Sequence, residues 1–275
     1  KQWTKNVFVF AALVFDRQLF IPASLVRTIA AFIVFCLLSS SVYVMNDIFD
    51  VQSDRLHPTK KNRPIASGSL PISIAIAFSI GLTLIALALA FWISTPLAII
   101  SLVYLLVNLL YSRWLKHIVL VDVLIIAFGF VLRVAAGVSV IQVQRFSPWL
   151  YVCMSLLALY LGFGKRRAEL SNTNSDARKV LSGYSIAFID QLITIVSAST
   201  LIAYSLYTFS APDLPGNHLM MLTIPFVLYG IFRYLYLIQM KDAGGEPEEL
   251  LLSDRPLQAA VLLWGLACVV IFYFT

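Results

Sequence analysis

Four side chains that can hold a cation lie close together between residues 46 and 54. Asn46, Asp50 and Asp54 are spaced at i, i+4 and i+8, and Asp47 lies one step round the same helix. Residues with that spacing share one side of an α-helix, so their oxygen atoms can converge. Hard oxygen ligands suit Mg²⁺, which keeps several waters and shares phosphate oxygens with a substrate. The spacing therefore predicts a magnesium site formed by Asn46, Asp47, Asp50 and Asp54.

A basic stretch follows this acidic group and ends at Gly68. Ammonium and guanidinium groups bind phosphate through charge-assisted hydrogen bonds, so the stretch is typical of a phosphate site beside the metal. An acidic helix end before a basic loop is also common at a membrane boundary with no catalytic role. Four metal-capable groups at helical spacing favour the functional interpretation. The basic residues of the stretch are Arg55, His57, Lys60, Lys61 and Arg63.

The composition indicates a membrane protein. Of the 275 residues 60% are hydrophobic and only 12% are charged, whereas soluble domains carry about 25% charged residues. Lys and Arg exceed Asp and Glu by 20 to 14, but no basic stretch is interleaved with aromatic residues in the manner of nucleic-acid-binding proteins. We therefore expect anionic substrates and no nucleic-acid partner. Cys36, Cys153 and Cys268 lie in apolar segments without metal-ligand spacing and indicate free thiols.

The hydropathy pattern predicts an all-α, polytopic membrane bundle of about nine transmembrane helices, forming one integral-membrane catalytic domain over residues 1–275. The first run is short for a span, and because the sequence begins with Lys1 we expect upstream residues to complete it. The apolar runs cover residues 1–15, 24–48, 70–93, 97–110, 118–141, 148–163, 185–210, 219–238 and 257–274.

The distribution of positive charge predicts the orientation. With the N-terminus, the connections 50–69, 111–117, 164–184 and 239–256 contain 15 of the 20 Lys and Arg residues. Cytoplasmic connections carry such an excess, although phosphate-binding residues contribute to the same asymmetry. We therefore expect a multi-pass protein of the cytoplasmic (inner) membrane, with its N-terminus and active site on the cytoplasmic side.

Two further polar groups lie in cytoplasmic connections. One is at residues 111–117, and the other begins with three bases at residues 165–167. Basic side chains at such positions also snorkel to the membrane surface, and Tyr is common there, so a structural role is an alternative. We predict that these groups, with the basic stretch and the N-terminus, bind the substrates. The predicted substrate-binding residues are Lys5, Lys60, Arg63, Tyr111, Arg113, Lys116, Lys165, Arg166, Arg167, Glu169 and Tyr184.

Arg133 lies inside a predicted span, where a charge is costly. Gly129 and Gly137 share its helix face, so a neighbouring helix can approach closely and supply a partner. The partner can be an acidic residue in a purely structural ion pair. The sequence does not assign roles to Asp122, Asp190 or Arg233.

The segment NDIFD at residues 46–50, at the inner end of the second span, resembles the UbiA superfamily of intramembrane prenyltransferases. This resemblance implies a helical bundle that binds a diphosphate through magnesium held by two acidic motifs, with a lateral opening for a polyprenyl chain. The second acidic motif is replaced here by GKRRAE, in which Glu169 is the nearest acid. Together with QWTKN, GKRRAEL and GGEPEELLLSDRPL, the motifs resemble the decaprenyl-phosphate phosphoribosyltransferase branch.

That branch implies Mg²⁺-dependent transfer of 5-phosphoribose from phosphoribosyl diphosphate (PRPP) to a polyprenyl (decaprenyl) phosphate, with release of diphosphate. Asp47, Asp50 and Asp54 are then the catalytic residues. One alternative is a UbiA-type prenyltransferase that moves a prenyl group from a prenyl diphosphate to an aromatic or other acceptor. Another is a polyprenyl-lipid carrier without chemistry, which would place ionisable residues along several spans. The oligomeric state stays open, a homo-oligomer included.

Overall fold

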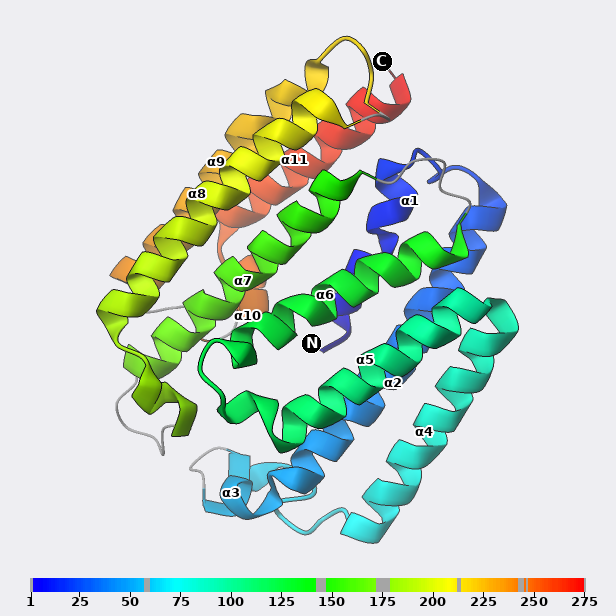
Figure 1. The fold of residues 1–275 in the computed structure, drawn as a ribbon, viewed down its shortest axis with the longest axis vertical. Helices are drawn as coiled ribbons and strands as arrows, with labels where there is room; N and C mark the ends of the chain where they lie inside the picture. The colour runs from blue at the N-terminus through cyan, green and yellow to red at the C-terminus, as the bar shows by residue number, and fades with distance from the viewer. Residues whose placement is uncertain are drawn as a thin grey trace.

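The computed structural model describes residues 2–56, 60–141, 147–171, 179–211, 214–241, 245 and 247–274, and these contain helices and no strand. Figure 1 shows the helices as an elongated bundle. The elements are η1 (Gln2–Phe10), α1 (Ala11–Phe15), α2 (Pro22–Phe49), α3 (Val51–Leu56), η2 (Lys60–Asn62), α4 (Ile72–Ile93), α5 (Thr95–Arg113), η3 (Leu115–His117), α6 (Val121–Val140), α7 (Pro148–Ser171), η4 (Lys179–Gly183), α8 (Ile186–Ser210), η5 (Leu219–Thr223), α9 (Ile224–Met240), α10 (Pro247–Ser253) and α11 (Arg255–Phe274).

Eight helices of the described chain are long and apolar enough to cross a membrane, and they correspond to the predicted spans from the second onward. The first predicted run is the shorter apolar segment Trp3–Phe15. Large apolar side chains such as Trp92 and Leu262 lie exposed on the outside of the bundle, which is the surface that lipid covers in a multi-pass protein. The predicted all-α, polytopic class is confirmed.

Two predicted spans are longer than expected because their helices continue into polar sequence. The run at 97–110 becomes α5, which starts where the Ser94 hydroxyl accepts a hydrogen bond from Leu97 N and ends only at Arg113. The run at 148–163 becomes α7, which continues to Ser171. Arg, Lys, Ala, Glu and Leu are strong helix formers, so GKRRAEL extends α7 instead of forming a loop. The predicted boundary of the third connection was wrong on this point.

The N-terminal segment lies in the middle of the bundle, where η1 packs against α2 and α6 (Figure 1). Asn6 and Val9 of η1 are completely buried. A Cβ atom on Gly137 would lie 2.0 Å from the Val9 carbonyl oxygen, so only glycine permits this approach. The predicted close approach to the Gly129, Arg133 and Gly137 face is therefore confirmed, with η1 as the neighbour.

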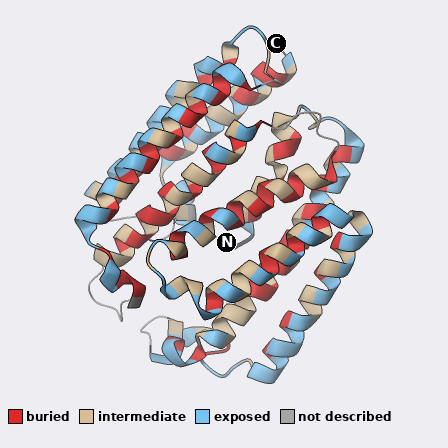
Figure 2. Ribbon diagram, in the orientation of Figure 1, coloured by how far each residue is buried: buried red, intermediate tan, exposed pale blue. Residues whose placement is uncertain are grey.

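Figure 2 shows buried residues along most helices of the bundle, and the two largest hydrophobic cores lie in the parts of the bundle that meet where α6 packs against α7. One core joins η1, α2, α4, α5 and α6, and the other joins α7, α8, α9 and the start of α11. The C-terminal ends of α2 and α7 and the N-terminal end of α6 lie at the same end of the bundle, near α3 (Figure 1). The polar motifs of the sequence therefore gather at this end.

Gly137→Ala tests the close packing of η1 on α6. We expect the free energy of unfolding to fall by about 1–3 kcal/mol because the new methyl group overlaps the Val9 carbonyl. Thermal unfolding in detergent measures the effect. Gly81→Ala is the matched control, since no atom lies within 4 Å of its added Cβ; equal melting temperatures for the two variants would contradict the described packing.

Candidate functional site

The acidic group lies at the junction of α2 and α3. Helix α2 ends at Phe49, and Asp50 has φ −93° and ψ 4° before α3 begins at Val51. The expected single helix is therefore two helices joined at Asp50. Asp50 N still donates to Asn46 O (2.9 Å) and Asp54 N to Asp50 O (2.8 Å), so helical spacing is kept across the junction.

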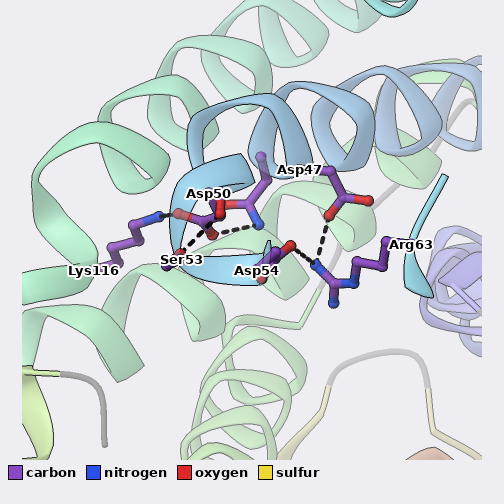
Figure 3. Close-up of polar contacts among 7 residues, drawn as sticks. Asp47, Asp50, Ser53, Asp54, Arg63 and Lys116 are labelled. Atoms are coloured by element: carbon purple, nitrogen blue, oxygen red, sulfur yellow. Dashed lines mark hydrogen bonds and ion pairs between the residues drawn. The ribbon is translucent and has the colours of Figure 1, made fainter. Parts of the chain in front are cut away.

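Arg63 bridges two of the three aspartates. Its Nη1 atom donates to Asp47 Oδ1 at 2.7 Å and to Asp54 Oδ2 at 2.8 Å (Figure 3). Asp54 is buried, and the charge of Lys60 also acts on Asp47. Two carboxylates that would otherwise repel each other are thus stabilised by one cation between them.

Asp50 binds a different cation, on the opposite side of the group from Arg63 (Figure 3). Lys116 Nζ of η3 donates to Asp50 Oδ1 at 2.5 Å, and Asn46 Nδ2 donates to Asp50 Oδ2 at 3.2 Å. Lys116 is largely buried and lies 66 residues further along the chain than Asp50. This ion pair brings the predicted polar group at residues 111–117 against the acidic group at residues 46–54.

The donor chemistry of this group fits a hard divalent cation. Asn46 and the three aspartates supply only oxygen ligands, and the charges of Asp50 and Asp54 act on Asp47. The Arg63 contacts show that one cation reaches both Asp47 and Asp54. In the described part of the chain no three His, Cys, Asp or Glu side chains converge on one point, and Asp50 pairs with Lys116. Arg63 and Lys116 are the present counter-ions of the group.

The basic motif of α7 is anchored by acids. Arg166 is completely buried; its Nε donates to Asp122 Oδ2 at 2.6 Å, and its Nη1 also pairs with Glu169. The Tyr184 hydroxyl donates to Asp122 Oδ1 (2.8 Å) and accepts from Leu120 N (2.7 Å). The described contacts of Arg166 are therefore with protein groups, and its predicted contact with phosphate stays a prediction.

This network fixes the turn between η3 and α6. Leu120 has a φ of 68°, a conformation that is uncommon for residues other than glycine. Burial raises the pKa of Tyr184 to about 12, so the phenol stays protonated and keeps its hydrogen bond to Asp122 at neutral pH. The turn places Lys116 at one end and Asp122 at the other, and so connects the acidic group to the α7 motif.

The remaining predicted residues lie in different places. Tyr111 interacts electrostatically with Arg166 and belongs to the same group. Lys165 is half-buried on the same turn of α7. Arg167 points to the other half of the bundle, where it donates to Asp190 Oδ1 and to the Ile238 carbonyl. Arg113 is exposed and lies over the Trp114 ring, and His57 lies outside the described residues.

Lys5 lies deeper in the bundle, in η1, where its charge acts on the Tyr104 phenol. Sequence reasoning left three charged residues without a role, and each now has a partner: Asp122 pairs with Arg166, Asp190 with Arg167, and Arg233 with Asp254 at 2.8 Å. The high cost of an unpaired charge in a span was the available signal, but helix order alone does not identify the partner.

Comparisons with known proteins agree with this architecture. The model of the UbiA prenyltransferase family matches residues 6–253. Decaprenyl-phosphate phosphoribosyltransferase of Mycolicibacterium smegmatis is 36% identical, with 96% of this chain and 87% of that protein covered. The protein of that name in Corynebacterium glutamicum is 32% identical, with 99% and 84% covered. The structure of a UbiA homologue from Archaeoglobus fulgidus bound to DMAPP and Mg²⁺ has a TM-score of 0.75 over the full length of both chains at 17% identity, and this likeness shows the fold.

Arg166→Gln tests the buried network. We expect a loss of about 3–5 kcal/mol in the free energy of unfolding, because Asp122 would be left buried without its counter-ion. Arg113→Gln, at an exposed position, should change stability little. Thermal unfolding of the two variants in detergent makes the comparison, and a wild-type melting temperature for Arg166→Gln would show that the pair does not hold α6 and α7 together.

Proposed function

The chain belongs to the UbiA prenyltransferase family, and from that premise we propose that it transfers 5-phosphoribose from PRPP to a polyprenyl phosphate and releases diphosphate. Relatives that are 32–36% identical over nearly the whole chain carry the name decaprenyl-phosphate phosphoribosyltransferase. The structural observation that supports the proposal is the meeting of an acidic group and two basic groups at one end of the bundle. Such a site suits a donor with several phosphates.

We assign Asn46, Asp47, Asp50 and Asp54 to a divalent metal ion, with Mg²⁺ as the expected species. When bound, the ion would neutralise charge on the diphosphate and so assist its departure. Hard oxygen donors favour Mg²⁺ over softer metals.

Arg63 and Lys116 are the bases nearest the carboxylates, and we assign them to the diphosphate. Both now form ion pairs with aspartates. Exchange of a carboxylate partner for a phosphate oxygen keeps each cation paired, so the charge balance of the site is maintained. Their attachment to different elements, the loop before α4 and η3, would fix the diphosphate from two sides.

The acceptor needs little activation. A polyprenyl phosphate is already an anion, so its oxygen attacks the ribose C1 carbon without a strong general base. A new C1–O bond forms while the bond from C1 to the diphosphate oxygen breaks, and the diphosphate leaves with the electron pair. Positive charge that develops on the ribose is stabilised by the nearby anionic groups. Attack from the face opposite the leaving group inverts C1.

The α7 motif supports this donor over a prenyl diphosphate. A prenyl diphosphate has two phosphates, whereas PRPP has a third on the ribose. Lys165, Arg166 and Arg167 occupy successive positions on α7, and the acids that contact the two arginines come from several elements. Lys165 is the member of this motif that we assign to the ribose 5-phosphate. The connections at the polar end of the bundle carry an excess of Lys and Arg. This excess supports placement of the site on the cytoplasmic side of the inner membrane.

Asp50→Ala tests the reaction and its metal dependence. Detergent-solubilised protein is incubated with radiolabelled PRPP, polyprenyl phosphate and Mg²⁺, and label is followed into the organic phase. We expect transfer by the wild type, loss of transfer on chelation, and a fall of about two orders of magnitude or more in the variant. Asp16→Ala, at the opposite end of the bundle, is the matched control. Wild-type rates in Asp50→Ala would remove the acidic group from the site.

Lys165→Ala tests the donor contact. We expect the KM for PRPP to rise about tenfold, which corresponds to the loss of one charge-assisted hydrogen bond of about 1.5 kcal/mol. The KM for the polyprenyl phosphate should stay near the wild-type value. Lys241→Ala, at the exposed end of α9, is the control. An unchanged KM for PRPP in Lys165→Ala would separate this position from the donor.

A further inference from the structure

Arg133 is a buried cation in the middle of α6, with 6% of its surface exposed. It lies twelve residues after Val121, or about 18 Å along the axis at about 1.5 Å per residue. Its Nε donates to Asn6 Oδ1 (2.8 Å), its Nη1 to Gly129 O (2.7 Å) and its Nη2 to the Tyr104 hydroxyl (3.0 Å). All three acceptors are neutral.

The other buried or half-buried arginines of the described chain have acidic partners. Arg63, Arg166, Arg167 and Arg233 each contact a carboxylate. Within the described part of the chain, Arg133 contacts none. A guanidinium that is removed from water inside a span is costly without an opposite charge, so this exception calls for an anion that the described residues do not supply.

Arg133 also has N–H groups left with which it can bind an anion. A guanidinium has five N–H groups, and the described acceptors engage three of them. Gly129 lets Nη1 pack directly against the α6 backbone, since an added Cβ atom there would lie only 3.3 Å from that nitrogen. The rings of Tyr104 and Phe130 lie 5.1 and 5.5 Å from the guanidinium carbon and stabilise the cation only in part.

The surroundings of Arg133 hold it in position. Asn6 is completely buried, and its amide nitrogen donates to Ser39 Oγ at 3.1 Å and to Cys36 Sγ at 3.4 Å, which directs its oxygen to Arg133. The charge of Lys5, the residue before Asn6, acts on the same Tyr104 phenol as Arg133 does. A second cation therefore lies near the first.

Tyrosine side chains connect the surroundings of Arg133 to the acidic group. Tyr43 of α2 also interacts with Tyr104, and Tyr43 lies four residues before Asp47. Four residues are one helical turn, about 6 Å along α2 at about 1.5 Å per residue. Tyr104 and Tyr43 thus link Arg133 to the helix that ends in the acidic group.

We propose that Arg133, together with Lys5 and held by Asn6 and Tyr104, forms a binding subsite for a phosphate monoester inside the bundle, separate from the diphosphate site. The inference rests on the proposed function, which requires two such groups besides the diphosphate: the phosphate of the acceptor lipid and the 5-phosphate of the donor. Both are dianionic, and either would compensate the charge of Arg133. The test below decides between them, and a donor result would move the ribose 5-phosphate from Lys165 to Arg133.

The test compares Arg133→Gln with Arg166→Gln, the variant that breaks a compensated pair. Removal of an uncompensated cation should leave the melting temperature of the ligand-free protein close to that of the wild type, whereas Arg166→Gln should lower it. A purely structural Arg133 predicts a comparable fall in both variants. That outcome, with ligand binding unchanged in the Arg133→Gln protein that remains folded, would overturn the proposal.

Binding is then measured without turnover, by thermal protection with ribose 5-phosphate and separately with undecaprenyl phosphate. We expect Arg133→Gln to weaken one of them at least tenfold, as expected for the loss of a charge-assisted contact. Selective loss of the sugar phosphate assigns the subsite to the donor, and selective loss of the lipid assigns it to the acceptor. Unchanged binding of both overturns the proposal. Arg133→Lys, which keeps the charge, should recover part of the affinity.

These readouts separate the subsite from the reaction. If the wild type does not transfer phosphoribose but Arg133→Gln loses phosphate binding, the proposed function fails and the phosphate subsite stands. If the wild type transfers phosphoribose and Arg133→Gln binds both phosphates as tightly as the wild type, the subsite fails and the proposed function stands.

Discussion

A charged side chain inside a membrane-spanning bundle is costly unless an opposite charge lies against it, and this requirement organises the structure. The pairs of the polar end tie together elements that are distant in sequence. Lys116 joins η3 to the end of α2, Arg166 joins α7 to α6, and Arg167 joins α7 to α8. Because each pair crosses between elements, compensation of charge and placement of the functional motifs are achieved by the same contacts.

The same requirement explains how acids and bases for one reaction coexist in one site. Arg63 and Lys116, which we assign to phosphate, are the counter-ions of the aspartates that we assign to the metal. A bound metal ion with its diphosphate would supply positive charge to the aspartates and negative charge to Arg63 and Lys116 at the same time. The α7 motif extends this principle, because its arginines are held by Asp122, Glu169 and Asp190. Arg133, compensated only by neutral groups, is the exception from which we infer a second phosphate subsite.

Much of the fold was predictable from hydropathy, since apolar runs of sufficient length determine spans. The ends of α5 and α7 were not predictable from hydropathy, because both helices continue into polar sequence. In α7 the strong helix formers of GKRRAEL continue the helix. In the candidate site, helical spacing predicted that the aspartates lie together, but it could not show that Asp50 would turn to Lys116, 66 residues away. The partners of Arg166 and Arg133 also depend on tertiary packing, which a local pattern does not contain.

The proposed site selects PRPP over a prenyl diphosphate. The most direct measurement is thermal unfolding of the detergent-solubilised protein with Mg²⁺ and either PRPP or geranyl diphosphate, at matched concentrations. A ligand that binds the folded state raises the melting temperature. We predict clear protection by PRPP that is lost on chelation, and much weaker protection by geranyl diphosphate. Strong protection by geranyl diphosphate with none by PRPP would contradict the account and indicate prenyl transfer.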